Sequence, residues 1–184
     1  MIKLNKLGFT LIELLAVIVI LALIMAVVIP NVTWSLNNSK LSTLHSKAKS
    51  LANYFSEAVV TYELSGGATT EDGTVSTVIN SNDYKYINKT TWVCLDSLSV
   101  PLKNTSELYA ADFILKKPSG GKTPDANNPT EGINSKTCSA VRTKDGVVEV
   151  ILVAKSGGRF AVPGTNKVTY AYSQDTEAKV IEIE

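Results

Sequence analysis

Little in this chain of 184 residues indicates catalysis or metal binding. Histidine occurs only as His45, and cysteine only as Cys94 and Cys138, so no Cys/His cluster has the spacing of a zinc site. No serine lies in the Gly-x-Ser-x-Gly pattern that marks the nucleophile of many hydrolases. We therefore predict no enzymatic activity, no resident metal and no cofactor, and we interpret His45 as an exposed residue.

The chain also lacks an excess of positive or negative charge. The chain has 18 Lys and Arg against 17 Asp and Glu. Lys3, Lys6 and Glu13 precede residue 31, so residues 31–184 hold 16 of each sign. This balance predicts neither a dedicated nucleic-acid surface nor one for acidic lipids.

Charge is nearly absent from one long stretch. Residues 9–29 are apolar apart from a threonine and Glu13. As a helix rising ~1.5 Å per residue, they would extend roughly 31 Å, about the thickness of a bilayer's hydrocarbon core. Lys3 and Lys6 precede the stretch and no basic residue follows until Lys40, so the positive-inside rule predicts a cytoplasmic N-terminus.

A cleaved secretory signal explains this stretch poorly, because its apolar region would be shorter, about 7–15 residues, and would end in small residues. A plain membrane anchor is an alternative. Glu13 argues against it, since a carboxylate in a membrane helix costs at least a few kcal/mol unless a partner neutralises it. The sequence therefore predicts a partner for Glu13.

The six residues Gly8-Phe9-Thr10-Leu11-Ile12-Glu13, placed between a short basic leader and the apolar run, resemble the N-terminus of type IV pilins. This family includes the pseudopilins of secretion and DNA-uptake machines. The resemblance covers residues 1 to about 32. It implies a prepilin peptidase that cuts between Gly8 and Phe9 and N-methylates Phe9. Residues 1–8 would be a cytoplasmic leader, and residues 9–30 a transmembrane and filament-core helix.

The resemblance also implies a partner for Glu13, namely the free N-terminal amine of a neighbouring subunit. Pro30 lies where many family members have a proline that bends or loosens the helix. Gly8 suits the cleavage site because an extended backbone without a Cβ enters a protease cleft without a clash. The implied partners are copies of this chain, the peptidase, the cytoplasmic membrane and an inner-membrane assembly platform.

The helix is expected to continue past Pro30. Apolar residues recur at spacings of three and four, which predicts an amphipathic helix over residues 31–64. They are Leu41, Leu44, Ala48, Leu51, Phe55, Ala58 and Tyr62. Ser65-Gly66-Gly67 supplies a stop signal. A coiled coil is an alternative explanation of the stripe.

Residues 65–184 are long enough for one modest extracellular domain. Segments 137–142 and 147–153 flank Lys144-Asp-Gly146, a strong hairpin signal. Further strand candidates are 158–162, 167–172 and 178–183, with short apolar islands at 91–95 and 108–115 and a long loop at 119–130. We predict an α+β fold in which the long N-terminal helix packs on a C-terminal antiparallel sheet.

Cys94 and Cys138 both lie in the predicted extracellular part, where an even pair favours a disulfide. Two reduced, buried cysteines are the alternative. Many pilins carry a bond around a variable C-terminal loop, but here 46 residues follow Cys138, so that role does not transfer. Pseudopilins can hold calcium before the last strand, where Asp175 and Glu177 offer only two carboxylates.

Three functions remain. The first is a structural subunit of a type IV pilus, anchored in the cytoplasmic membrane and then assembled into a surface filament for adhesion, motility or aggregation. The second is a pseudopilin of a type II secretion or competence system. The third is a tethered domain that never assembles, against which Glu13 and the Gly8-Phe9 junction argue.

Overall fold

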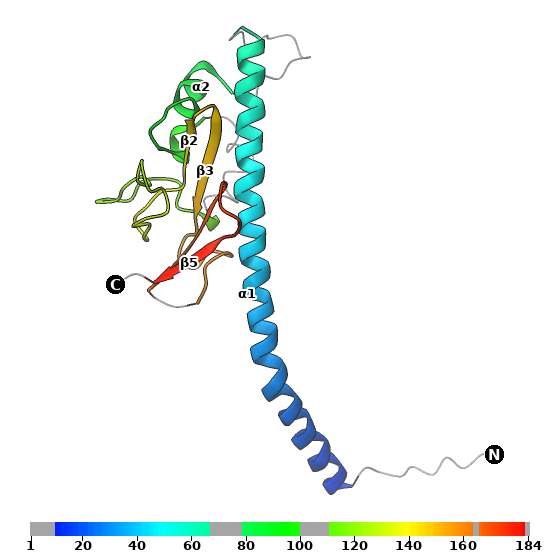
Figure 1. Cartoon of the computed structure of the whole chain (residues 1–184). Coiled ribbons are helices and arrows are strands. Elements are labelled where there is room, and N and C mark those ends of the chain that lie inside the picture. The colour runs from blue at the N-terminus through cyan, green and yellow to red at the C-terminus, as the bar shows by residue number, and fades with distance from the viewer. Residues whose placement is uncertain (1–9, 67–78, 100–110, 164–165, 183–184) are drawn as a thin grey trace, which may run out of the picture. The chain divides into compact units, whose positions relative to one another are not determined.

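The computed structural model describes residues 10–66, 79–99, 111–163 and 166–182. Its contacts divide the chain into two compact units, residues 1–39 and 40–184, and one helix, α1 (Leu11–Leu64), contributes to both (Figure 1). In the second unit the strands form one antiparallel sheet. This confirms the predicted α+β fold, with a long N-terminal helix followed by an antiparallel sheet.

In the second unit, the predicted apolar stripe of α1 packs into the core. Leu44, Ala48, Leu51, Phe55 and Ala58 are all buried, which confirms those five positions. The two ends of the predicted stripe, Leu41 and Tyr62, are partly buried against the same cluster. Because these side chains contact this chain's own sheet, the stripe needs no coiled-coil partner.

The sheet has the simplest order, with each strand paired antiparallel to the next along the chain. Its strands are β1 (Val93–Cys94), β2 (Ala140–Lys144), β3 (Val147–Val153), β4 (Lys167–Tyr172) and β5 (Lys179–Glu182). The hairpin between β2 and β3 turns at Asp145 and Gly146, whose φ angles are 52° and 77°. Two consecutive positive φ angles match the twist of the flanking strands, as the Asp-Gly signal predicts.

Both faces of the sheet are covered. On one face Val141, Val150 and Leu152 join the cluster that contains the α1 stripe. On the other face, the strand residues that alternate with these, such as Ile151 and Val153, pack with Trp92 and Ile133 from the connecting segments. Strands buried on both sides read as continuous apolar runs, which explains why residues 147–153 carry only one charged residue.

Two sequence expectations need correction. Residues 158–162 form no strand, because their backbone groups are used in turns: Gly158 N donates to Lys155 O at 2.9 Å and Ala161 N donates to Gly158 O at 3.1 Å. His45 is not fully exposed, since its Nε2 contacts the backbone oxygen of Asp175 at 2.9 Å. Both arrangements depend on hydrogen bonds that the alternation and spacing of apolar residues cannot predict.

One short helix was not predicted at all. Helix α2 (Ser81–Ile87) begins after Asn80, whose side chain accepts a hydrogen bond from Asp83 N. Tyr84 of α2 stacks on Tyr62 of α1, with ring centroids 4.5 Å apart. A seven-residue helix is too short for a clear apolar period, so tertiary contacts decide its formation.

Candidate assembly site

Glu13 closes the first turn of α1. Its Oε2 accepts hydrogen bonds from Thr10 N and Thr10 Oγ1, both at 2.8 Å, and Glu13 N donates to Thr10 Oγ1 at 3.3 Å. This is a capping box, in which the side chains of the N-cap and of the third helical residue satisfy each other's backbone donors. Thr-x-x-Glu at residues 10–13 is its sequence signal.

The capping box gives Glu13 a local role beside any role between subunits. Both short contacts reach the same oxygen, Oε2. A carboxylate has room for more than two hydrogen bonds, so the group can accept a further donor without leaving Thr10. Gly8 and Phe9, the predicted cleavage pair, lie outside the described residues.

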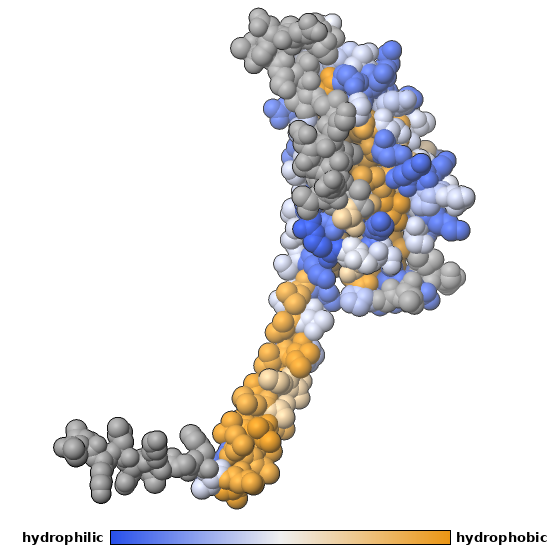
Figure 2. Space-filling view, turned by 180° about the vertical axis from the view of Figure 1, so that it is seen from behind, coloured by the Kyte–Doolittle hydropathy of each residue, from blue (hydrophilic) through white to orange (hydrophobic). Residues whose placement is uncertain are grey.

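The first unit presents an apolar helix surface. Large apolar side chains from Leu11 to Leu36 are between 47% and 82% exposed, and Figure 2 shows apolar side chains over the visible part of this segment. Such a surface needs lipid or other helices around it. Among the described residues, α1 is the one helix long and apolar enough to cross a membrane.

Pro30 lies inside α1 without ending it. Proline has no N–H, so one helical hydrogen bond is missing there. Two polar side chains just after it bond backward to carbonyls: Asn31 Nδ2 donates to Val27 O at 3.1 Å and Thr33 Oγ1 to Ile29 O at 2.8 Å. Such bonds shield polar side chains within an apolar environment.

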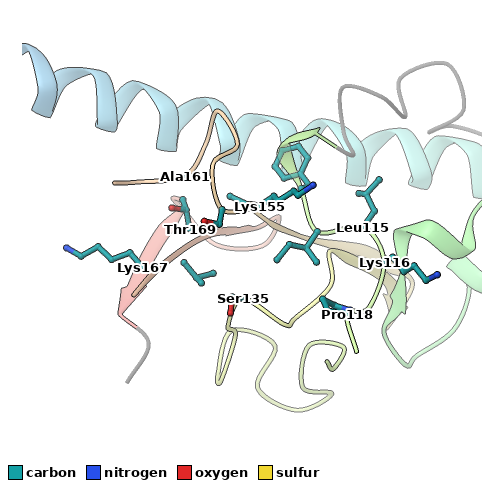
Figure 3. Close-up of a pocket in the computed structure, with 13 residues that line it drawn as sticks. Leu115, Lys116, Pro118, Ser135, Lys155, Ala161, Lys167 and Thr169 are labelled. Atoms are coloured by element: carbon teal, nitrogen blue, oxygen red, sulfur yellow. The ribbon is translucent and has the colours of Figure 1, made fainter. Parts of the chain in front are cut away.

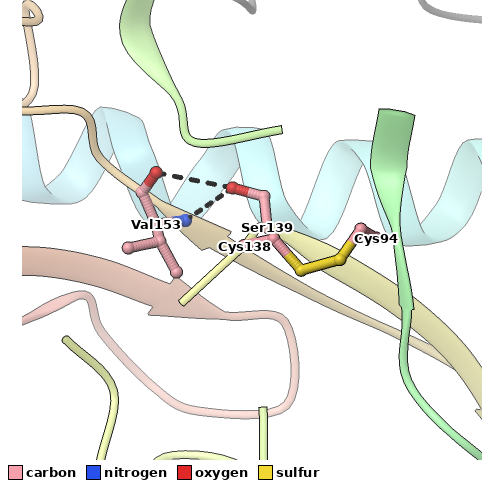
Figure 4. The surroundings of a disulfide bond; sticks show 4 residues. All are labelled: Cys94, Cys138, Ser139 and Val153. Atoms are coloured by element: carbon pink, nitrogen blue, oxygen red, sulfur yellow. Dashed lines mark hydrogen bonds between the residues drawn. A yellow bond between two sulfur atoms is a disulfide. The ribbon is translucent and has the colours of Figure 1, made fainter. Parts of the chain in front are cut away.

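A disulfide joins Cys94 of β1 to Cys138, just before β2, with 5.7 Å between the Cα atoms (Figure 4). Next to it, Ser139 Oγ accepts a hydrogen bond from Val153 N at 2.9 Å and donates to Val153 O at 3.4 Å. The bond therefore fastens the short edge strand β1 at the point where β2 begins, beside the end of β3.

We expect that replacing both cysteines with serine lowers the free energy of unfolding by roughly 3–4 kcal/mol, the chain-entropy value for a loop of this length. The two residues are 44 apart in sequence. Urea unfolding of the full chain in detergent measures the change. Adding reductant to the double variant is the control and should shift nothing. Equal midpoints for the variant and the oxidised wild type would contradict the prediction.

A buried ion pair ties the loop at 119–130 to the sheet. Arg142 Nε lies 2.6 Å from Glu149 Oε2, and these side chains are 3% and 11% exposed. The guanidinium also stacks on Trp92, 4.4 Å from the ring centroid, and donates to Ala126 O at 2.6 Å. Burial, with Glu149 nearby, raises the pKa of Tyr172 to about 12.

Residues 3–29 match the model of the prokaryotic N-terminal methylation motif. The chain carries a prepilin-type signal. This signal is shared by type IV pilins and pseudopilins, and it supports a pilin-like or pseudopilin-like, structural rather than enzymatic protein. No curated protein and no solved structure significantly matches the chain.

The prepilin-type signal and the apolar helix together fit a membrane-anchored precursor. The signal also implies processing by a prepilin peptidase and polymerisation into a pilus-like filament. It ends at residue 29, one residue before Pro30.

Proposed function

We propose that the protein is a structural subunit of a type IV pilus, cut between Gly8 and Phe9, methylated on Phe9 and assembled through α1. The observation that carries the proposal is an exposed apolar helix whose first turn holds a single carboxylate, Glu13, within the prepilin-type signal. After cleavage Glu13 would be the fifth residue of the mature chain.

Glu13 would set the height at which each subunit enters the filament. In hydrocarbon an unpaired carboxylate and an unpaired amine are both costly, and each relieves the other. Removing one member of a buried pair typically costs ~3–5 kcal/mol. A subunit placed one turn too high or low would leave both charges without partners, so the pair selects one register.

The same helix surface serves before and after assembly. Leucine, isoleucine and valine pack as well against neighbouring helices as against lipid tails. Transfer of α1 from the membrane into a bundle of identical helices therefore exposes no apolar surface to water. Pro30 removes one hydrogen bond from the helix and would ease any adjustment of α1 within the filament.

Mass spectrometry of the mature N-terminus, in cells that contain the peptidase, tests the processing step. We expect a chain that begins at methylated Phe9. Gly8→Ala is expected to be partly processed, and Gly8→Trp to remain uncut because the indole blocks the cleft. Asn5→Trp, which places the same ring away from the cut, is the matched control and should be processed. An intact Met1 in the wild type would overturn the proposal.

The location of the assembled protein separates the pilus from the alternative, a pseudopilin of a secretion or competence system. Immunogold labelling of intact cells should decorate long surface filaments if the subunit forms a pilus. Absence of surface filaments, with loss of protein secretion or DNA uptake on deletion, would favour the pseudopilin. A processed chain that forms no surface filaments, and whose deletion affects neither secretion nor DNA uptake, would favour a membrane-tethered domain that does not assemble.

A further inference from the structure

A cavity of about 500 Å³ lies where β3 ends and β4 begins, beside the segment 113–118 (Figure 3). Its lining is largely apolar, and the apolar members are Phe113, Ile114, Leu115, Pro118, Ala154, Ala161 and Val168. Small-molecule sites are typically apolar concavities of roughly 300–1,000 Å³ with a few polar groups. This cavity lies wholly within the second unit.

The polar members of the lining are cations and hydroxyls: Lys116, Lys155, Lys167, Ser135, Ser156 and Thr169. None of the described lining residues is acidic. Lys167 pairs with Glu182 at 3.1 Å, whereas no ion pair of Lys116 or Lys155 is found in the part of the chain that the structure describes. In Figure 3, Lys155 extends along the cavity and the other two lysines lie at opposite ends.

Lys155 stands on a firmly held turn. Its N–H donates to Asp112 O at 2.7 Å, and its carbonyl accepts from Gly158 N at 2.9 Å. A Cβ at Gly158 would lie 3.0 Å from the carbonyl oxygens of both Asp112 and Lys155, so the turn favours glycine there. Asp112 is held in turn by Arg159, whose NH2 and Nε lie 2.5 and 2.9 Å from Oδ2.

Arg159 keeps the carboxylate of Asp112, beside the turn that carries Lys155, ionised. Hydrogen bonding from the guanidinium lowers the pKa of Asp112, which therefore stays ionised well below neutral pH. The backbone that carries Lys155 is held by its own hydrogen bonds to Asp112 O and Gly158 N, which need no ligand. Preorganisation of this kind reduces the ordering cost of binding.

We propose that this cavity, which we call the lysine cavity, binds a small organic carboxylate whose apolar body fills the lining and whose carboxylate pairs with Lys155. Charge complementarity carries the choice of an anion: within the described residues, the Lys155 ammonium has no ion pair and the cavity lining contains no acidic side chain. Lys116 adds positive charge at one end. None of these residues belongs to the prepilin-type signal, so the proposal does not depend on filament assembly.

Titration of 2-naphthoate into the full chain in lipid nanodiscs tests the proposal. The readout is the NMR shift of the methyl groups of Ile114, Leu115 and Val168, which line the cavity, so partition of the probe into the bilayer does not count. We expect saturable shifts. The uncharged isostere 2-naphthamide should bind at least about 10-fold more weakly, because it has no negative charge to pair with the Lys155 ammonium.

Three variants sharpen the test. Lys155→Gln should weaken naphthoate binding about 10-fold, while Lys144→Gln, which changes an exposed lysine at the end of β2, should leave it unchanged. Ala161→Leu should block both probes by filling the cavity. Naphthoate binding that is equal in Lys155→Gln and wild type, equal affinity for the amide, or no saturable shift at all would each overturn the proposal.

Discussion

Glu13→Gln is expected to stop incorporation of the subunit into filaments while leaving the start of α1 intact. Glutamine can replace glutamate in a capping box, so the hydrogen bonds to Thr10 are kept. Only the charge is lost. If that charge meets an amine in the filament core, its loss costs about 3–5 kcal/mol per subunit, which corresponds to a decrease in assembly of more than about 100-fold.

Two further variants separate the two roles of Glu13. Thr10→Val breaks the cap but keeps the charge, and should cost only about 1 kcal/mol of helix stability, so filaments persist. Glu57→Gln removes an exposed carboxylate from the same helix and is the charge control. Filament yield, measured by shearing and immunoblotting and normalised to processed subunit in the membrane, is the readout. Normal yield from Glu13→Gln, with loss in Glu13→Ala, would assign Glu13 to capping alone.

Arg142→Met is expected to destabilise the second unit by about 3–5 kcal/mol, since it leaves the buried Glu149 carboxylate without its cation. A loss of this size is a large share of the roughly 5–15 kcal/mol that stabilises a typical domain. The same change removes the stacking on Trp92 and the bond to Ala126 O, so the loop at 119–130 loses its link to β2.

Urea unfolding of the full chain, followed by tryptophan fluorescence, measures this effect. Lys167→Met is the matched control: its partner Glu182 is 77% exposed and its own side chain 39% exposed, so its loss should cost less than about 1 kcal/mol. The double variant Arg142→Met/Glu149→Leu should recover much of the lost stability, because no buried charge is then left alone. Equal destabilisation by Arg142→Met and Lys167→Met would contradict the prediction.

Local sequence rules predicted several elements well. The three-four spacing from Leu44 to Ala58 anticipated the buried face of α1, and Asp145-Gly146 anticipated the hairpin between β2 and β3. Both signals act over a few neighbouring residues, so the order of the sequence alone carries them. The strand expected at 158–162 was wrong because contacts with Asp112, far away in the sequence, hold that segment as turns.

Some features of the candidate sites could be predicted from contiguous residues, and others depend on contacts between distant segments. The prepilin-type signal and Glu13 are contiguous features and are visible without any structure. The Arg142–Glu149 pair is different, because both residues are charged and a charged side chain in a strand suggests solvent exposure when the sequence is taken alone. The segment that covers them comes from residues 125–126, which no periodicity connects to β2.

The sequence by itself determined that a membrane-length apolar helix begins with a lone carboxylate, that its second half has an apolar face, and that alternating strands follow. These properties depend on residues within a turn or a strand of one another. Only the tertiary structure decided that Arg142 is buried against Glu149 and that Lys155 borders an apolar cavity. Each of these requires segments distant in sequence to share one core, and that pairing is set by packing and the burial of polar groups.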